Sequence, residues 1–144
     1  MSNDRVQIIA KLHQDHVYMA ELIKRIRLIC DSGSPDEDCH QCDPGRRIPC
    51  HMNIEHLIRT LVEVTIRHNL IESACMEEGV PREHRIAHNR AHLDISETMR
   101  SIRLDFKENG DGIVAIEQIS SVLDQLDAHL ANFDRAMEQF LLEA

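Results

Sequence analysis

Residues 65–92, TIRHNLIESACMEEGVPREHRIAHNRAH, contain two pairs of imidazole and carboxylate side chains spaced four residues apart. The first pair is His68 and Glu72, and the second is His88 and His92. In an α-helix, residues four apart project from one face at neighbouring depths. The Gly-Val-Pro segment at 79–81 predicts a turn between two helices, so the two pairs can converge. Imidazole and carboxylate at this spacing are typical of a metal-binding face, and iron is among the metals that accept such mixed donors.

The composition of the 144-residue chain favours a single all-α domain. Aromatic residues make up 3%, Trp is absent, and there are only 5 Gly and 4 Pro residues. The formal charge of -9 argues against nucleic acid or anionic lipid as the main partner. No run approaches the roughly 20 apolar residues of a membrane span, and residues 1–4 lack a signal-peptide core. We therefore expect a cytoplasmic protein, in which clustered cysteines more often serve metal or redox chemistry than structural disulfides.

Hydrophobic periodicity predicts four helices, over residues 4–30, 49–78, 82–107 and 113–142. The Asn-Gly-Asp-Gly segment at 109–112 predicts a turn between the last two helices, and Pro49 suits the first turn of the second. Residues 31–49 are rich in Ser, Gly, Pro and Asp, which indicates a loop insertion. The predicted fold of the single domain, residues 1–144, is an antiparallel up-down-up-down four-helix bundle with a cysteine-containing loop between its first two helices.

Each predicted helix carries an inward stripe at alternating three- and four-residue spacing, and polar side chains fall within these apolar stripes. The fourth helix also carries His129 and Asp134, which lie about 140° apart in an ideal α-helix and would approach a metal from different sides. The expected stripes are Ile9, Leu12, His16, Met19, Ile23, Ile26 and Cys30; Ile54, Ile58, Leu61, Thr65, His68, Glu72 and Cys75; His88, His92, Ile95, Met99, Ile102 and Phe106; and Ile116, Ile119, Leu123, Leu126, Leu130, Phe133 and Met137.

The two inward carboxylates, Glu72 and Asp134, are the strongest argument for a metal site. No Lys or Arg lies on the inward stripes to compensate their burial, so a metal cation is the natural counter-charge. At about 1.5 Å of rise per residue, the candidate donors of all four helices fall near one level of the bundle. A shift in the preceding loop would make His84-x3-His88 the alternative to the second histidine pair. The predicted metal ligands are His16, His68, Glu72, His88, His92, His129 and Asp134.

Together these motifs resemble the hemerythrin family, which includes bacterial hemerythrin-like proteins and HHE cation-binding domains. The resemblance covers the four helices and rests on His16 in Leu-His-Gln-Asp-His, His68-x3-Glu72 followed by Met76 and Gly-Val-Pro, His88-x3-His92, and His129-x4-Asp134. It implies two non-haem irons joined by both carboxylates and by an oxo or hydroxo bridge. By analogy, one iron takes the last three histidines of this set and the other takes the first two.

This ligand set implies one open position on the iron with two histidines. Dioxygen, or another small diatomic or anionic ligand such as nitric oxide or azide, would bind there. We therefore expect reversible binding or sensing of such a ligand by a metalloprotein that is not an enzyme. Family members often carry an aromatic residue and a Trp where this chain has Asn69 and Gln125, and a polar pocket favours autoxidation. The alternative is peroxidase-like redox chemistry, scavenging peroxide or nitric oxide, or iron delivery.

The predicted loop contains Cys39-x2-Cys42, with Cys30 before it and Cys50 after it. These thiols could bind zinc or an iron–sulfur centre, form a redox-switchable disulfide, or remain unpaired. A loop that reports metal or redox state to a protein partner, or that mediates self-association, is a further alternative. About 21 Å of helix separates His16 from Cys30, so we expect these cysteines at the bundle end away from the iron and not among its ligands.

Overall fold

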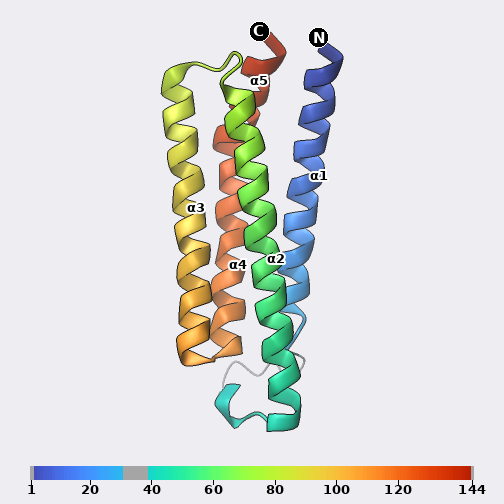
Figure 1. Cartoon of the computed structure of the whole chain (residues 1–144), viewed down its shortest axis with the longest axis vertical. Helices are drawn as coiled ribbons and strands as arrows, with labels where there is room; N and C mark the ends of the chain where they lie inside the picture. Colours follow the sequence, from blue (N-terminus) through green and yellow to red (C-terminus); the bar gives the residue numbers. More distant parts are fainter. Residues whose placement is uncertain (1, 31–38, 144) are drawn as a thin grey trace.

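The computed structural model describes residues 2–30 and 39–143, and the long elements within them are helices. These helices are α1 (Ser2–Arg27), α2 (Pro44–Met76), α3 (Arg82–Asn109), α4 (Gly112–His129) and α5 (Arg135–Glu143). Figure 1 shows α1 to α4 side by side, with α5 continuing the line of α4 and both termini at one end. The predicted all-α helical bundle is confirmed. None of the described helices combines the length and the apolar run that a bilayer crossing requires.

The second helix begins earlier than expected. We placed its start near Pro49, but α2 starts at Pro44 and continues through Pro49. Pro44 takes the first helical position, where its missing N–H costs nothing, and the carbonyl of Asp43 accepts from the amides of Arg46 (2.9 Å) and Arg47 (2.8 Å). The interpretation of residues 44–49 as loop was therefore wrong. Before α2 lies the short 3₁₀ helix η1 (Cys39–Gln41), and residues 31–38 lie outside the described part of the chain.

The turn between α3 and α4 is capped on both sides. Gly110 ends α3 in the left-handed conformation, with φ 62°, and its amide donates to the carbonyl of Phe106 at 2.8 Å. Asp111 then caps the N-terminus of α4, since its carboxylate accepts hydrogen bonds from the amides of Ile113 (3.1 Å) and Val114 (3.2 Å). Figure 1 shows this turn at the same end of the bundle as η1, opposite the termini.

Most of the expected inward positions are buried, with two local differences. On α2, Met76 is buried where we expected Cys75, which is only half-buried. Residues three and four positions beyond an inward residue can both face inward, and contacts with the neighbouring helices select between them. On α4, Ala115 and Val122 are buried, whereas the expected Ile116 and Leu123 pack partly buried against the same cluster.

Two apolar clusters fill the interior. Along the chain, the predicted metal ligands of each long helix are preceded by residues of one cluster and followed by residues of the other. The larger cluster includes Met19, Leu61, Ile95 and Val122, and continues toward the α3–α4 turn. The smaller cluster, nearer the termini, consists of Leu12, Met76, Val80, Met137 and Leu141. The bundle interior is therefore apolar, then polar, then apolar along its length.

We predict that Gly110→Ala destabilises the protein by about 1 to 2 kcal/mol, because an L-residue in the left-handed region brings its Cβ too close to the backbone. A Cβ at this position would otherwise meet nothing closer than 3.9 Å, so the cost is conformational. Gly45→Ala, in the first turn of α2, is the matched control and should leave stability unchanged or slightly raised. Chemical denaturation followed by circular dichroism measures both, and equal midpoints would contradict the assignment of strain to Gly110.

Candidate metal centre

The structure brings all seven predicted donors into one buried site, although their role as ligands stays a prediction. The donors form two overlapping groups, and within each group the candidate ligand atoms lie within 4.8 Å of one another. The first group is Glu72, His88, His92, His129 and Asp134, and the second is His16, His68, Glu72 and Asp134. The two carboxylates belong to both groups. The buried cluster can therefore hold metal, and its donors are arranged around two centres.

A π-helical turn, η2 (Leu130–Asp134), joins α4 to α5 and corrects our expectation for His129 and Asp134. We expected these side chains on different sides of a continuous α-helix. Instead, the amide of Arg135 donates to the carbonyl of Leu130, five residues earlier, so the helix is locally wider. This turn places residues five apart on one face, and His129 Nε2 lies 3.1 Å from Asp134 Oδ1. Both side chains therefore enter the site from the same direction.

All five imidazoles present the same nitrogen, Nε2, to the centre of the cluster. His16 Nε2 and His68 Nε2 lie 3.0 Å apart, as do His88 Nε2 and His129 Nε2. His92 Nε2 lies 2.9 Å from Glu72 Oε1. Imidazole nitrogens with inward lone pairs repel one another unless a proton or a cation lies between them. Convergence of five ring nitrogens on one point suits metal coordination.

The two carboxylates connect the halves of the site. Asp134 Oδ1 lies 2.9 Å from His88 Nε2, and its Oδ2 lies 3.0 Å from His16 Nε2, so each oxygen faces a different group. Glu72 Oε1 lies 3.1 Å from His68 Nε2 as well as close to His92. Glu72 is 0% and Asp134 1% exposed. Each carboxylate therefore lies within 3.1 Å of histidines from both groups.

The electrostatics of the cluster favour ionised carboxylates. Burial alone would raise the pKa of Glu72, but contacts from His68, His88 and His92 outweigh it and hold that pKa well below its usual range. Burial likewise opposes ionisation of Asp134, and the surrounding imidazoles again depress its pKa. Burial also disfavours charge on His88, yet the adjacent carboxylates raise its pKa to about 9. The site thus holds negative charge that needs nearby positive charge.

Hydrogen bonding within the protein leaves part of this charge unsatisfied. Among the described residues, neither oxygen of Asp134 nor Oε2 of Glu72 has a hydrogen-bond partner of acceptable geometry. The imidazole nitrogens lie within 3.1 Å of Asp134 but not in the directions that hydrogen bonds take. An unsatisfied buried carboxylate oxygen is costly. Together with the Nε2 convergence, these oxygens fit metal cations at the centre of the cluster.

Two residues lie behind the donors: Asp15, which was not predicted to take part, and His84, which we considered only as an alternative ligand. Asp15 Oδ2 lies 3.3 Å from His68 Nδ1, and His84 Nε2 lies 3.0 Å from His88 Nδ1. When Nε2 is the ligand atom, Nδ1–H is the group that such a neighbour orients. His84 therefore supports His88 from outside and does not replace His92, so the alternative His84-x3-His88 pairing is not what the structure shows. Asp15 could have been found from its place in Leu-His-Gln-Asp-His.

The second group is the more accessible of the two. The side chain of His16 is 19% exposed, whereas the other four imidazoles are buried. A small cavity of about 30 Å³ adjoins His16, and its walls are mainly apolar. Gln125, where we expected pocket polarity, is exposed and does not line it, and Asn69 is half-buried. The cavity is lined by His16, Met19, Ala20, Leu123, Leu126, Asp127 and Leu130.

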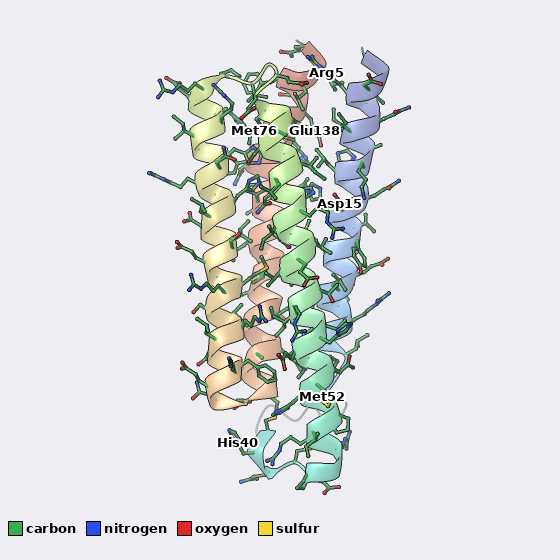
Figure 2. The ribbon with its side chains drawn as sticks, viewed as in Figure 1. Arg5, Asp15, His40, Met52, Met76 and Glu138 are labelled. Atoms are coloured by element: carbon green, nitrogen blue, oxygen red, sulfur yellow. The ribbon has the colours of Figure 1, made fainter. Side chains whose placement is uncertain are left out.

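The cysteines do not join this site. Neither donor group contains a cysteine, in agreement with the expectation that they would not be ligands here. Figure 2 shows His40, in the cysteine segment, at the opposite end of the bundle from Arg5, whereas Asp15 lies nearer Arg5.

Comparison with protein-family models, curated proteins and solved structures finds no match for this chain. The resemblance to the hemerythrin family therefore rests on the residues and their geometry alone.

We predict that the chelator-stripped protein takes up two divalent transition-metal ions per chain. Unfolding should then cost about 4 kcal/mol more for each bound ion at a free metal concentration 1,000-fold above Kd, because only the folded chain assembles the donors. Asp134→Asn removes an oxygen from both groups and should lower uptake and stabilisation. Glu138→Gln, whose side chain contacts His13 outside the cluster, is the control. Elemental analysis and thermal unfolding provide the readouts, and unchanged uptake by Asp134→Asn would exclude a bridging carboxylate.

Asp15→Asn should weaken binding of one ion by about 10- to 100-fold without abolishing it, because the substitution removes the carboxylate behind His68. Lys11→Gln is the matched control, since Lys11 binds the same Asp15 carboxylate at 3.0 Å from the solvent side. Metal titration against a competing chelator measures both variants. Equal loss of affinity in the two would show that Asp15 acts through general surface charge instead of through His68.

Proposed function

We propose that this chain is a hemerythrin-like protein that holds two non-haem irons and reversibly binds dioxygen or a similar small ligand, such as nitric oxide or azide. The proposal includes the antiparallel up-down-up-down arrangement with an insertion between α1 and α2. It also includes bridging of the irons by Glu72, Asp134 and an oxo or hydroxo group.

The observation that carries the proposal is the sharing of both carboxylates between two donor groups. Three histidines, His88, His92 and His129, accompany the carboxylates in one group, and His16 and His68 accompany them in the other. A single ion would not account for Asp134, whose two oxygens face histidines of different groups. This is the pairing that the family resemblance implies for each iron.

The chemistry of the donors supports iron. All seven side chains supply nitrogen or oxygen, and no thiolate lies among them. Imidazole and carboxylate donors of this kind suit iron, whereas soft thiolate sites select other metals or iron–sulfur clusters. Iron in this site would supply a redox couple and a coordination position for an outside ligand. The remaining properties of the site come from the chain.

The two donor groups of the site differ in their number of side-chain donors. The three-histidine group offers five side-chain donors and the two-histidine group offers four. An ion in the second group therefore has fewer protein ligands and more room for an external one. The same group contains His16, the one histidine of the five that is not fully buried, and the small cavity lies against it. The half of the site that an outside ligand can reach is thus also the half with fewer protein donors.

The lining of this cavity favours binding over turnover. A volume of about 30 Å³ accommodates a diatomic molecule or a water-sized ligand, and a second, more open hollow of about 330 Å³ also reaches His16. Met19, Leu123, Leu126 and Leu130 supply most of the wall of the smaller cavity and limit the access of water. A dry pocket slows the proton-dependent loss of a bound ligand and the oxidation that follows. Reversible binding is therefore better supported than redox catalysis.

The central experiment uses two-iron protein reduced under anaerobic conditions. On exposure to dioxygen, we expect a change in the visible absorption spectrum that reverses when the gas is removed, with two irons retained per chain. Azide added to the oxidised protein should produce a saturable spectral change of its own. Two irons without any response to either ligand would refute the ligand-binding function while leaving the metal site intact.

Ala20→Val tests the access route, because two added methyl groups at the cavity wall take up the space beside His16. We expect slower and weaker ligand binding with unchanged iron content. Ala10→Val, at an exposed position of the same helix, is the control for the lower helix propensity of valine. Stopped-flow absorbance measures the association rates, and identical rates in the two variants would place the access route elsewhere.

A further inference from the structure

Four of the five cysteines gather at the end of the bundle opposite the termini. Cys39 begins η1, Cys42 follows it directly, Cys50 lies on the first turns of α2, and Cys30 follows the end of α1. None of these cysteines forms a disulfide in the described structure. The proposed oxygen-binding function makes no use of them, so this second cluster needs its own explanation.

Cys39 is the centre of the group. It is 8% exposed, and its Sγ lies 3.1 Å from His51 Nε2. The backbone amide of Gly112, the first residue of α4, donates to the same Sγ at 3.2 Å. A Cβ added at Gly112 would lie 3.4 Å from Sγ and 3.0 Å from Ile54 Cδ1, so the absence of a side chain permits this close approach. The sulfur thus has one backbone N–H group and one imidazole nitrogen beside it.

The other thiols are near enough to interact electrostatically. Burial raises the pKa of the Cys50 thiol, and the charges of Cys30, Cys39 and Cys42 raise it further. Arg46 acts in the opposite direction on the same thiol. Cys30, Cys39 and Cys42 therefore all lie close enough to Cys50 for their charges to reach it.

We propose that Cys30, Cys39, Cys42 and Cys50 form a second metal site that takes a zinc-class divalent ion in tetrahedral thiolate coordination. The Cys-x2-Cys spacing with two further cysteines is the pattern of such structural sites. Each thiol releases one proton to solvent as it binds, so the loaded site carries two negative charges. Arg46 and the amide N–H of Gly112 beside Cys39 offset that charge.

The surroundings of Cys39 favour a metal over a disulfide. A metal-bound thiolate accepts hydrogen bonds strongly, and such N–H donors orient it and reduce its charge. A disulfide sulfur is a weak acceptor and would leave the Gly112 amide poorly satisfied in a buried position. No three of these donors lie within 4.8 Å of one another among the described residues. Binding would therefore draw the sulfurs together around Cys39.

A metal here would cross-link the bundle end. Its ligands come from the end of α1, from η1 and from the start of α2, and Cys39 is hydrogen-bonded to the first residue of α4. The site is independent of the iron centre in its donors, its position and its preferred metal. Failure of one proposal therefore does not entail failure of the other.

The test begins with reduced full-length protein that has been loaded with two irons, so that the first site is filled. Zinc is then titrated against a chromophoric chelator, and cobalt serves as a spectroscopic probe. We expect one zinc per chain, and we expect the cobalt-loaded protein to show thiolate-to-metal charge-transfer absorption, which nitrogen and oxygen donors cannot produce. No zinc uptake, or cobalt binding without that absorption, would overturn the proposal.

Cys39→Ser and Cys42→Ser should each weaken zinc binding by at least about 100-fold with iron content unchanged. Cys75→Ser, which alters the one cysteine outside the group, is the control and should bind zinc like the parent. His51→Gln should weaken binding by about 10-fold or more but retain one zinc, because it removes a hydrogen bond and no ligand. Equal affinity of Cys39→Ser and Cys75→Ser would exclude the site. A disulfide among these cysteines that forms in air equally well with and without zinc, detected by mass spectrometry, would also exclude it.

Discussion

The structure depends on two buried carboxylates surrounded by five inward-facing imidazole nitrogens. Glu72 and Asp134 are almost completely buried, and neither faces a Lys or Arg within the cluster. Such burial is unfavourable unless the charge is balanced nearby, and protonated imidazole or a metal ion can balance it. The inward Nε2 atoms suit both kinds of counter-charge, because an imidazole nitrogen can carry a proton or coordinate a metal ion. The stability of the buried cluster therefore depends on this counter-charge.

An apolar cluster lies on each side of this polar layer along the bundle. In α1, Leu12 and Met19 flank His16 and belong to different clusters. The flanking layers exclude water, which strengthens every charge interaction between them. Low dielectric also explains why the residues behind the ligands matter, because Asp15 and His84 act on imidazoles that solvent cannot orient. A wet site with the same seven donors would hold metal less specifically.

The two ends of the bundle present different donors. Nitrogen and oxygen lie in the interior toward the termini, and sulfur lies at the far end beside the α3–α4 turn. Hard and soft donors on separate levels would allow one chain to select different metals without competition. Helix length provides the separation, since α1 has 26 residues, with His16 well within it and Cys30 beyond its end. The single helix α1 thus carries His16 and leads to Cys30, and its length keeps the two groups of donors apart.

The sequence by itself determined the helical class, most inward positions and the seven donors, because helical periodicity places residues three and four apart on one face whatever surrounds them. It also placed Cys30, Cys39, Cys42 and Cys50 away from these seven donors. The tertiary structure alone decided the π turn that aligns His129 with Asp134, the start of α2 at Pro44, and the choice of Met76 over Cys75. These features follow from contacts between helices, which a local pattern does not contain. For the same reason, only the assembled bundle shows which oxygen of Asp134 faces which histidine.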